Sequence, residues 1–343
     1  MSEHNGSTQA VERMTRILFI YRNFPPPRFI ENDYNILKKH FFVLPLKYDG
    51  NIVKSSIKFI KYGLKSDIFF VWFAGVQAIF SVFFAKILRK KVIVVAGGYD
   101  VVYEPKIDYG VFMKWYRAAM ALIVFKESDV AIPVSESTKR ELLQNTRPKK
   151  VVLIYNGIDT DYFKPQGAKK DIVITVGAIN KSNLKRKGLE TFVKTSVHLP
   201  ETRFVLVGSS DGSIERLKRI AGENVEFKGF VKLEKLLSLY QESKVYVQLS
   251  FHEGFGVALA EAMSCECVPI VTRRAALPEI VGDCGIYVPY DDDVMAAKKI
   301  RQILKDGNLG SLGRKSRKRI EERFSLKRRE KELVKLIKDM MIP

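Results

Sequence analysis

The chain has 343 residues, of which 46% are hydrophobic and 28% are charged, so it is long enough for two domains that each bury a core. Lys and Arg number 58 against 38 Asp and Glu, and the net charge of +20 favours acidic partners such as nucleic acid, anionic lipid or phosphorylated small molecules. Three cysteines, Cys265, Cys267 and Cys284, argue against a disulfide framework and fit a reducing compartment. Cys265 and Cys267 have no histidine nearby, so we interpret them as packing residues and not as metal ligands.

Apolar runs and helical patterns alternate after the polar residues 1–10. Those first residues lack the charged-then-apolar pattern of a signal peptide, so we expect a cytoplasmic protein. Alternating strands and helices, the latter exemplified by 111–126, favour a doubly wound parallel sheet. The strands expected in this half are 16–21, 41–46, 68–74, 91–96, 130–134 and 151–155.

One apolar stretch, residues 68–88, is long enough to cross a bilayer. It also divides into a strand, a turn at Gly75 and a helix, and the strand 91–96 follows. Strand, helix and strand in this order form a βαβ unit of a parallel sheet, and we favour that interpretation over a membrane span.

The alternation restarts after the Gly- and Pro-containing segment 156–170, which we interpret as the interdomain linker. Two successive patterns predict two Rossmann-like α/β domains that face each other across a cleft, with a ligand between the carboxyl ends of their sheets. We expect the domains at 1–168 and 169–322, and a basic C-terminal helix at 323–343 that returns to the first domain. The strands expected in the second half are 171–177, 203–208, 225–229, 245–250, 268–272 and 285–289, and the helices are 187–198, 213–221, 233–242, 256–265 and 291–304.

The most informative stretch is SFHEGFGVALAEAM at 250–263. A strand ends at Ser250, and a turn with two glycines opens a helix whose free amides can bind an anion. Glu253 and Glu261 lie eight residues apart, which is about 12 Å along a continuous helix. This spacing exceeds the roughly 5–9.5 Å of a glycosidase carboxylate pair, so we expect two separate contacts along an elongated ligand.

This stretch closely resembles the Glu-x7-Glu signature of glycosyltransferase family 4, the retaining GT-B enzymes. TVGAINKSNLKRKGLETF, FVLVGSSDGS, VEFKGFVKLEKLLSLYQESKVYVQLS, LPEIVGDCGIYVP and IYNGIDTDYF resemble further segments of the family in the same order. The resemblance implies a GT-B fold and the transfer of a sugar from a nucleoside diphosphate donor.

The resemblance also implies roles for individual residues. Glu261 is expected to bind the ribose hydroxyls of the donor, Glu253 the hydroxyls of the transferred sugar, and Lys187 the diphosphate. The amides of Gly254, Phe255 and Gly256 are expected to hold the sugar and the distal phosphate. The other donor-side candidates are Arg186, Ser250, Gly177 and Val231.

The chain departs from the family pattern on the donor side. Ala178 stands where the family usually has Arg, and Asn183, Lys185 or Arg186 are the candidates to supply the missing contact.

Two further departures lie on the acceptor side. Residues 22–27, RNFPPP, replace a glycine-rich loop by a stiff turn. Gly97-Gly98-Tyr99-Asp100 stands where many members carry His, so Asp100, and after it Tyr99, are the candidate acceptor-side groups.

We therefore expect a retaining, metal-independent hexosyltransferase that acts on a lipid-linked, polysaccharide or other glycan acceptor, with UDP, GDP and ADP all open as donor nucleotides. The run 291–293 is interpreted as a helix N-terminus and not as a cluster of metal-binding carboxylates. The alternatives are a non-hydrolysing sugar-nucleotide epimerase on the same scaffold and, from another class, a basic nucleic-acid-binding protein. The sequence contains no nucleic-acid-binding motif, so no nucleic-acid partner is expected.

Two local predictions concern the backbone and the surface. Glu266 follows a predicted helix end where the family often places Gly, so we expect a left-handed backbone conformation there. Residues 54–65, KSSIKFIKYGLK, alternate apolar and basic residues at helical spacing. Such a helix can rest on anionic lipid, although an ordinary surface helix has the same pattern.

Overall fold

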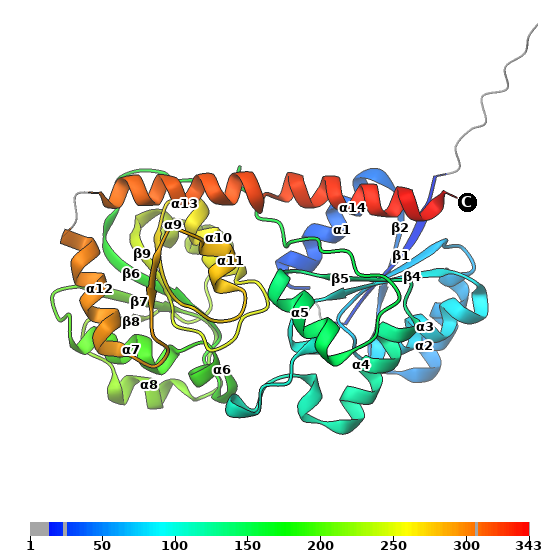
Figure 1. Cartoon of the computed structure of the whole chain (residues 1–343), viewed down its shortest axis with the longest axis horizontal. Coiled ribbons are helices and arrows are strands. Elements are labelled where there is room, and N and C mark those ends of the chain that lie inside the picture. The colour runs from blue at the N-terminus through cyan, green and yellow to red at the C-terminus, as the bar shows by residue number, and fades with distance from the viewer. Residues whose placement is uncertain (1–13, 23–25, 306–307, 343) are drawn as a thin grey trace, which may run out of the picture.

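Five parallel strands form the N-terminal sheet of the computed structural model, which describes residues 14–22, 26–305 and 308–342 (Figure 1). The strands are β1 (Arg16–Tyr21), β2 (Phe42–Lys47), β3 (Ile68–Trp72), β4 (Lys91–Ala96) and β5 (Val130–Pro133), in the order β2-β1-β3-β4-β5. The helices of this domain are α1 (Arg28–His40), α2 (Ile52–Gly63), α3 (Val76–Leu88), α4 (Trp115–Glu127) and α5 (Glu136–Asn145), and three short 3-10 turns, η1 to η3, lie within 99–113.

Alternate residues of these strands point to opposite faces, and each face has its own apolar cluster. Phe70 packs in the cluster that includes α1 and the last helix of the chain, whereas Phe69 and Val71 pack in the cluster with α2, α3 and α4. The near-continuous apolar runs of β3, β4 and β5 are therefore buried on both sides, whereas the edge strand β2 is largely exposed or half-buried.

The C-terminal sheet has six parallel strands in the order β11-β10-β9-β6-β7-β8. The strands are β6 (Lys170–Val176), β7 (Arg203–Val207), β8 (Val225–Phe227), β9 (Ser243–Gln248), β10 (Val268–Thr272) and β11 (Ile286–Val288). The helices are α6 (Lys181–Arg186), α7 (Leu189–Val197), α8 (Ile214–Ile220), α9 (Leu233–Glu242), α10 (Val257–Ser264), α11 (Leu277–Val281), α12 (Asp293–Lys305) and α13 (Leu309–Arg323). The two α/β domains expected from the sequence are both present.

The stretch 68–88 folds as β3 and α3, as expected from the βαβ interpretation. Within the described part of the chain, no helix has both the length and the apolar character needed to cross a membrane. Glu266 has a φ of 62°, which confirms the predicted left-handed conformation after α10.

The prediction of a strand at 151–155 is wrong. The segment forms no strand, and its pairing with the sheet is limited to one isolated bridge between Val151 and Ala131 of β5. The carbonyl oxygens of Ile154 and Tyr155 instead accept hydrogen bonds from Arg329, at 3.1 and 2.7 Å. An arginine from the far end of the sequence thus satisfies backbone groups that the apolar pattern assigned to a strand.

The final helix, α14 (Leu326–Met341), continues from α13 and lies along α1 of the N-terminal domain (Figure 1). Arg329, buried on α14, forms a bidentate ion pair with the buried Asp33 of α1, with N–O distances of 2.5 and 2.7 Å. Asp33 also accepts a hydrogen bond from Trp72 Nε1 at 3.0 Å. The chain at Gly157 lies close against the start of α14. Any larger residue would collide there, because a Cβ on Gly157 would lie 2.8 Å from the Cα of Leu326.

Candidate active site

Both sheets have a point at which the strand order reverses, and doubly wound sheets bind ligands at this point. In the C-terminal sheet it lies between β6, which Gly177 follows, and β9, after which comes Ser250. In the N-terminal sheet it lies between β1, which leads to Arg22, and β3, which leads to Phe73. Direct contacts across the domains connect the loops that leave these two sheets.

Glu253 lies in the turn between β9 and α10 and is buried. Its Oε1 lies 3.2 Å from Lys187 Nζ and 3.5 Å from Arg186 Nη1, and accepts a hydrogen bond of 3.2 Å from Ser250 Oγ. Burial alone would raise the pKa of Glu253, but the charges of Lys187 and Arg186 outweigh it and hold the pKa at about 2. Glu253 is therefore an anion at neutral pH.

Glycines on both sides hold Lys187 in this position. Gly188 has a φ of 64°, in the left-handed region, and a Cβ there would collide with the carbonyl oxygen of Leu249. A Cβ on Gly177 would lie 2.7 Å from Cδ of Lys187, so Gly177 leaves room for the lysine stem. The left-handed conformation of Gly188 separates α6, which ends at Arg186, from α7. Helix α7 therefore begins at Leu189, two residues later than predicted.

The turn from Gly254 to Gly256 leads into α10, and Gly256 has a φ of 95° just before the helix. The amides of the first helical turn lack intrahelical partners, as the expected anion site requires. Gly254 also has a function that the sequence did not reveal. A Cβ on Gly98 would lie 2.9 Å from the Cα of Gly254, so the backbones of the two domains meet here without side chains.

Glu261 is buried on α10, and Arg28 of the N-terminal domain forms an ion pair with it, with an N–O distance of 3.2 Å. Burial raises the pKa of Glu261 to about 7, and the charge of Arg28 only partly opposes this. The guanidinium of Arg28 also lies 4.8 Å from the ring centroid of Phe163. Arg28 was not predicted, because no local pattern links it to a glutamate 233 positions away.

Asn183 and Arg186 fill the region beside Ala178. Asn183 donates to the carbonyl oxygen of Ala178 at 2.8 Å, and its own side-chain oxygen accepts from Arg186 Nη2 at 2.7 Å. The guanidinium of Arg186 also lies 4.9 Å from the ring centroid of Tyr109, which belongs to the N-terminal domain. Lys185, the third candidate, has an exposed side chain.

The start of α5, in the N-terminal domain, contacts the turn from Gly254 to Gly256, which we call the donor-side turn. Ser135 Oγ and Thr138 Oγ1 both donate to the carbonyl oxygen of Gly254, at 2.6 and 3.0 Å. The carboxylate of Glu279 accepts hydrogen bonds from the backbone amides of Glu136 and Ser137, at 2.9 and 3.2 Å. A glutamate of one domain thus caps a helix of the other.

His252 and Glu141 form a further contact between the domains, with Nε2 and Oε1 2.6 Å apart. Nothing in the sequence near Ser135 or His252 indicated that Gly254 or Glu141 would meet them. These residues, like Arg28, were missed because their partners are distant in the sequence.

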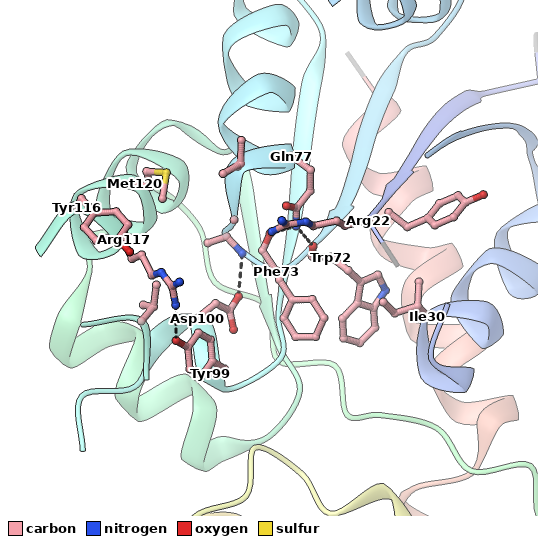
Figure 2. A pocket seen from close by; sticks show the side chains of 15 residues that line it. Arg22, Ile30, Trp72, Phe73, Gln77, Tyr99, Asp100, Tyr116, Arg117 and Met120 are labelled. Atoms are coloured by element: carbon pink, nitrogen blue, oxygen red, sulfur yellow. Dashed lines mark hydrogen bonds between the residues drawn. The ribbon is translucent and has the colours of Figure 1, made fainter. Parts of the chain in front are cut away.

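A cavity of about 530 Å³ opens at the reversal point of the N-terminal sheet (Figure 2). Asp100 and Tyr99 both line it, next to Gly98, which touches the donor-side turn. The backbone amides of Gly97, Gly98 and Ala74 donate to the carboxylate of Asp100, at 3.0 to 3.1 Å. Burial raises the pKa of Asp100 to about 6 against the opposing effect of these amides.

Two candidate positions remain: Val231 on the donor side and the turn 22–27 on the acceptor side. Val231 lies between β8 and α9 and is partly buried. Of the stiff turn 22–27, residues 23–25 are not described. Among the described residues, no group of three His, Cys, Asp or Glu side chains is placed to hold a metal ion.

The chain folds into two Rossmann-like domains whose points of strand-order reversal are connected by contacts across the domains. The Glu-x7-Glu segment from Glu253 to Glu261 lies at the reversal point of the C-terminal sheet. Together these features define a GT-B glycosyltransferase. Family models match both halves: Glycosyltransferase Family 4 at residues 10–162 and Glycosyl transferases group 1 at 170–306. The chain therefore belongs to the family 4, or group 1, glycosyltransferases.

The chain is similar to the uncharacterized glycosyltransferase MJ1069 of Methanocaldococcus jannaschii, with 25% identity over 94% of this chain and 82% of that protein. It is also similar to the N-acetyl-alpha-D-glucosaminyl L-malate synthase of Bacillus anthracis, with 28% identity over 58% of this chain and 56% of that protein. The match therefore covers little more than half of the latter protein.

Solved structures share the fold. Anabaena Alr3699/HepE in complex with UDP and glucose has a TM-score of 0.80 and 15% identity, covering 95% of this chain and 99% of that chain. Sucrose-phosphate synthase from Thermosynechococcus elongatus has a TM-score of 0.78 and 19% identity, covering 95% and 99%. At these identities the similarity concerns the fold alone.

Proposed function

We propose that this glycosyltransferase moves a sugar from a nucleoside diphosphate sugar to a hydroxyl group of a lipid-linked, polysaccharide or other glycan acceptor, with retention of anomeric configuration. The observation that carries the proposal is the cluster of Glu253, Lys187 and Arg186 at the reversal point of the C-terminal sheet. It combines an ionised carboxylate for sugar hydroxyls with two cations for a diphosphate. The complex of HepE with UDP and glucose, on the same fold, supports a donor of this kind.

In the proposed reaction, Lys187, Arg186 and the amides at the start of α10 stabilise the negative charge that grows on the departing diphosphate. The acceptor hydroxyl attacks the face that the diphosphate leaves, and a phosphate oxygen takes its proton. Glu253 orients the sugar and forms no bond to it. Glu261 binds the ribose hydroxyls, and these contacts replace its ion pair with Arg28.

We propose catalysis without a bound metal, because Lys187 and Arg186 already supply positive charge at the diphosphate. Transfer should survive EDTA treatment with less than a twofold change in rate. Loss of transfer with EDTA, restored by magnesium or manganese, would contradict this part of the proposal.

The donor is tested first by the thermal shift of the full chain with UDP-, GDP- and ADP-glucose, since a ligand specific for the native state raises the melting temperature. The preferred donor is then incubated with candidate acceptors, and NMR gives the anomeric configuration of the product. Retention is expected. An inverted product, or a trapped glycosyl–Glu253 adduct, would overturn the mechanism.

We further propose a cytoplasmic protein that can rest on an anionic membrane through α2. Val53, Ile57 and Ile60 project from α2 at helical spacing and are exposed, as is Leu64, which follows the helix. Lysines 54, 58 and 61 lie beside this stripe, and α2 contains no acidic residue. An exposed apolar stripe flanked by lysines is typical of helices that lie on membranes.

A further inference from the structure

The cavity at the reversal point of the N-terminal sheet has walls of two kinds. Aromatic and aliphatic side chains form most of the lining, and two arginines, Arg22 and Arg117, belong to it as well (Figure 2). In Figure 2, Arg117, Tyr116 and Met120 lie on one side of the cavity, and Arg22 and Trp72 on the other. At about 530 Å³, the cavity is within the size range of small-molecule sites.

Among the residues that the structure describes, neither arginine is neutralised by an acid. Within the described part of the chain, no carboxylate forms an ion pair with Arg22 or Arg117, and Arg117 donates to the hydroxyl of Tyr99 at 3.0 Å. The one acid in the wall, Asp100, is held by three backbone amides. Two guanidinium groups without carboxylate partners in the lining of a largely apolar cavity suit a phosphate on an otherwise apolar molecule.

Helix α4 connects this cavity with the outer surface. Tyr116, Arg117 and Met120 line the cavity, whereas Trp115, Leu122 and Ile123 form a neighbouring stripe with exposed fractions of 83%, 42% and 53%. An exposed apolar stripe that large is unusual for a helix surrounded by water. A ligand leaving the cavity along α4 would reach this stripe.

The stripe continues over the neighbouring helices, because α4 packs on α3 and α3 packs on α2 (Figure 1). Phe83 and Ile87 of α3 are exposed, as is the stripe on α2. We call the exposed apolar residues of α2, α3 and α4 the apolar face. These three helices contain six basic residues, Lys54, Lys58, Lys61, Lys86, Arg117 and Lys126, and one acidic residue, Glu127.

We propose that the acceptor is a lipid phosphate, with its phosphate bound between Arg22 and Arg117 and its apolar chain running along α4 into an anionic bilayer that covers the apolar face. The inference rests on the proposed transfer reaction and names its acceptor class. The positive charge around the apolar face selects an anionic bilayer over a neutral one. The hydroxyl that receives the sugar would lie near Gly98, where the cavity meets the donor-side turn.

The cavity is tested with a tryptophan that the protein already contains. The chain has two tryptophans, Trp72 in the cavity wall and the exposed Trp115, so Trp115→Phe leaves Trp72 as the only emitter. Decyl phosphate should change the Trp72 emission saturably and bind at least tenfold more tightly than decanol or inorganic phosphate. Arg117→Gln and Arg22→Gln, each in the Trp115→Phe background, should weaken decyl phosphate by about tenfold or more and leave decanol unchanged. Equal affinity for decanol and decyl phosphate would overturn the assignment.

The apolar face is tested by sedimentation of the full chain with vesicles of phosphatidylcholine alone or mixed equally with phosphatidylglycerol. Only the anionic vesicles should bind. Val53→Ser should weaken that binding by about tenfold. Val294→Ser on α12, at a position of similar exposure (73% for Val53 and 62% for Val294), is the matched control and should bind as the wild type does. Equal binding of both variants, or no binding of the wild type, would overturn the docking of this face.

Donor binding separates this inference from the proposed function. The same variants should keep the thermal shift with the preferred nucleotide sugar, since none lies in the Glu253 cluster. A normal thermal shift with the nucleotide sugar, together with equal affinity for decyl phosphate and decanol, would refute only the lipid phosphate acceptor. The absence of a shift with all three nucleotide sugars would refute the donor instead.

Discussion

Lys187→Ala is the substitution that bears most directly on the proposed chemistry. Lys187 is the closer of the two cations at Glu253, 3.2 Å away against 3.5 Å for Arg186. A unit charge about 4 Å from the leaving oxygen contributes about 4 kcal/mol at an effective dielectric constant of about 20. Because only part of a full charge develops in the transition state, we expect a loss of about 3–4 kcal/mol, or roughly two to three orders of magnitude in kcat.

The assay is initial-rate kinetics with the preferred donor, and Lys185→Ala serves as the matched control. Lys185 lies in the same basic run, but its side chain is exposed. The control should keep kcat within about twofold, and both variants should keep the wild-type circular dichroism spectrum. A Lys187→Ala variant with unchanged kcat and only a raised KM would refute the reasoning, because Lys187 would then bind substrate and transition state equally.

Four further outcomes are expected. Glu253→Gln should slow turnover by about tenfold to a hundredfold, far less than the roughly millionfold loss of a removed nucleophile; a millionfold loss would contradict the orienting role. Because the pKa of Glu261 is raised to about 7, donor affinity should rise with pH through that value as the carboxylate becomes ionised, and Glu261→Gln should remove this dependence and raise the donor KM. The same shift implies that the unliganded protein loses stability as pH rises from about 4.5 to about 7, since the unfolded state ionises first. Arg329→Met should lower the free energy of unfolding in urea by about 3–5 kcal/mol, because it leaves the buried Asp33 unpaired; a change no larger than that of the exposed Arg328→Met would contradict this.

The sequence predicted most of the secondary structure, because parallel strands buried on both faces leave continuous apolar runs such as 68–74 and 91–96. It failed at 151–155, where the apolar pattern was equally clear but Arg329 binds the backbone carbonyl oxygens. An apolar run indicates burial, and burial alone does not determine which groups satisfy the backbone.

In the candidate site, too, the sequence predicted some residues and missed others. Glu253 and Lys187 were recognised through local motifs, and the structure brings them together. Arg28, Thr138 and Glu279 could not be found in this way, since each meets its partner across two domains. The position of Gly254 was predicted from the motif, but the need for a glycine there also comes from the opposing backbone of the other domain.

The chain passes between the domains twice, once before β6 and once between α13 and α14, and the two passages are bonded to each other. The amide of Ile158 donates a hydrogen bond to the carbonyl oxygen of Phe324. The amide of Leu326 in turn donates to the carbonyl oxygen of Ile158, and both bonds are 2.8 Å long. We therefore expect that a rotation of one domain against the other has its axis near Ile158. Such a rotation must break contacts between the domains, among them those of Gly254 with Gly98 and Ser135, before a donor can enter or a product leave between them.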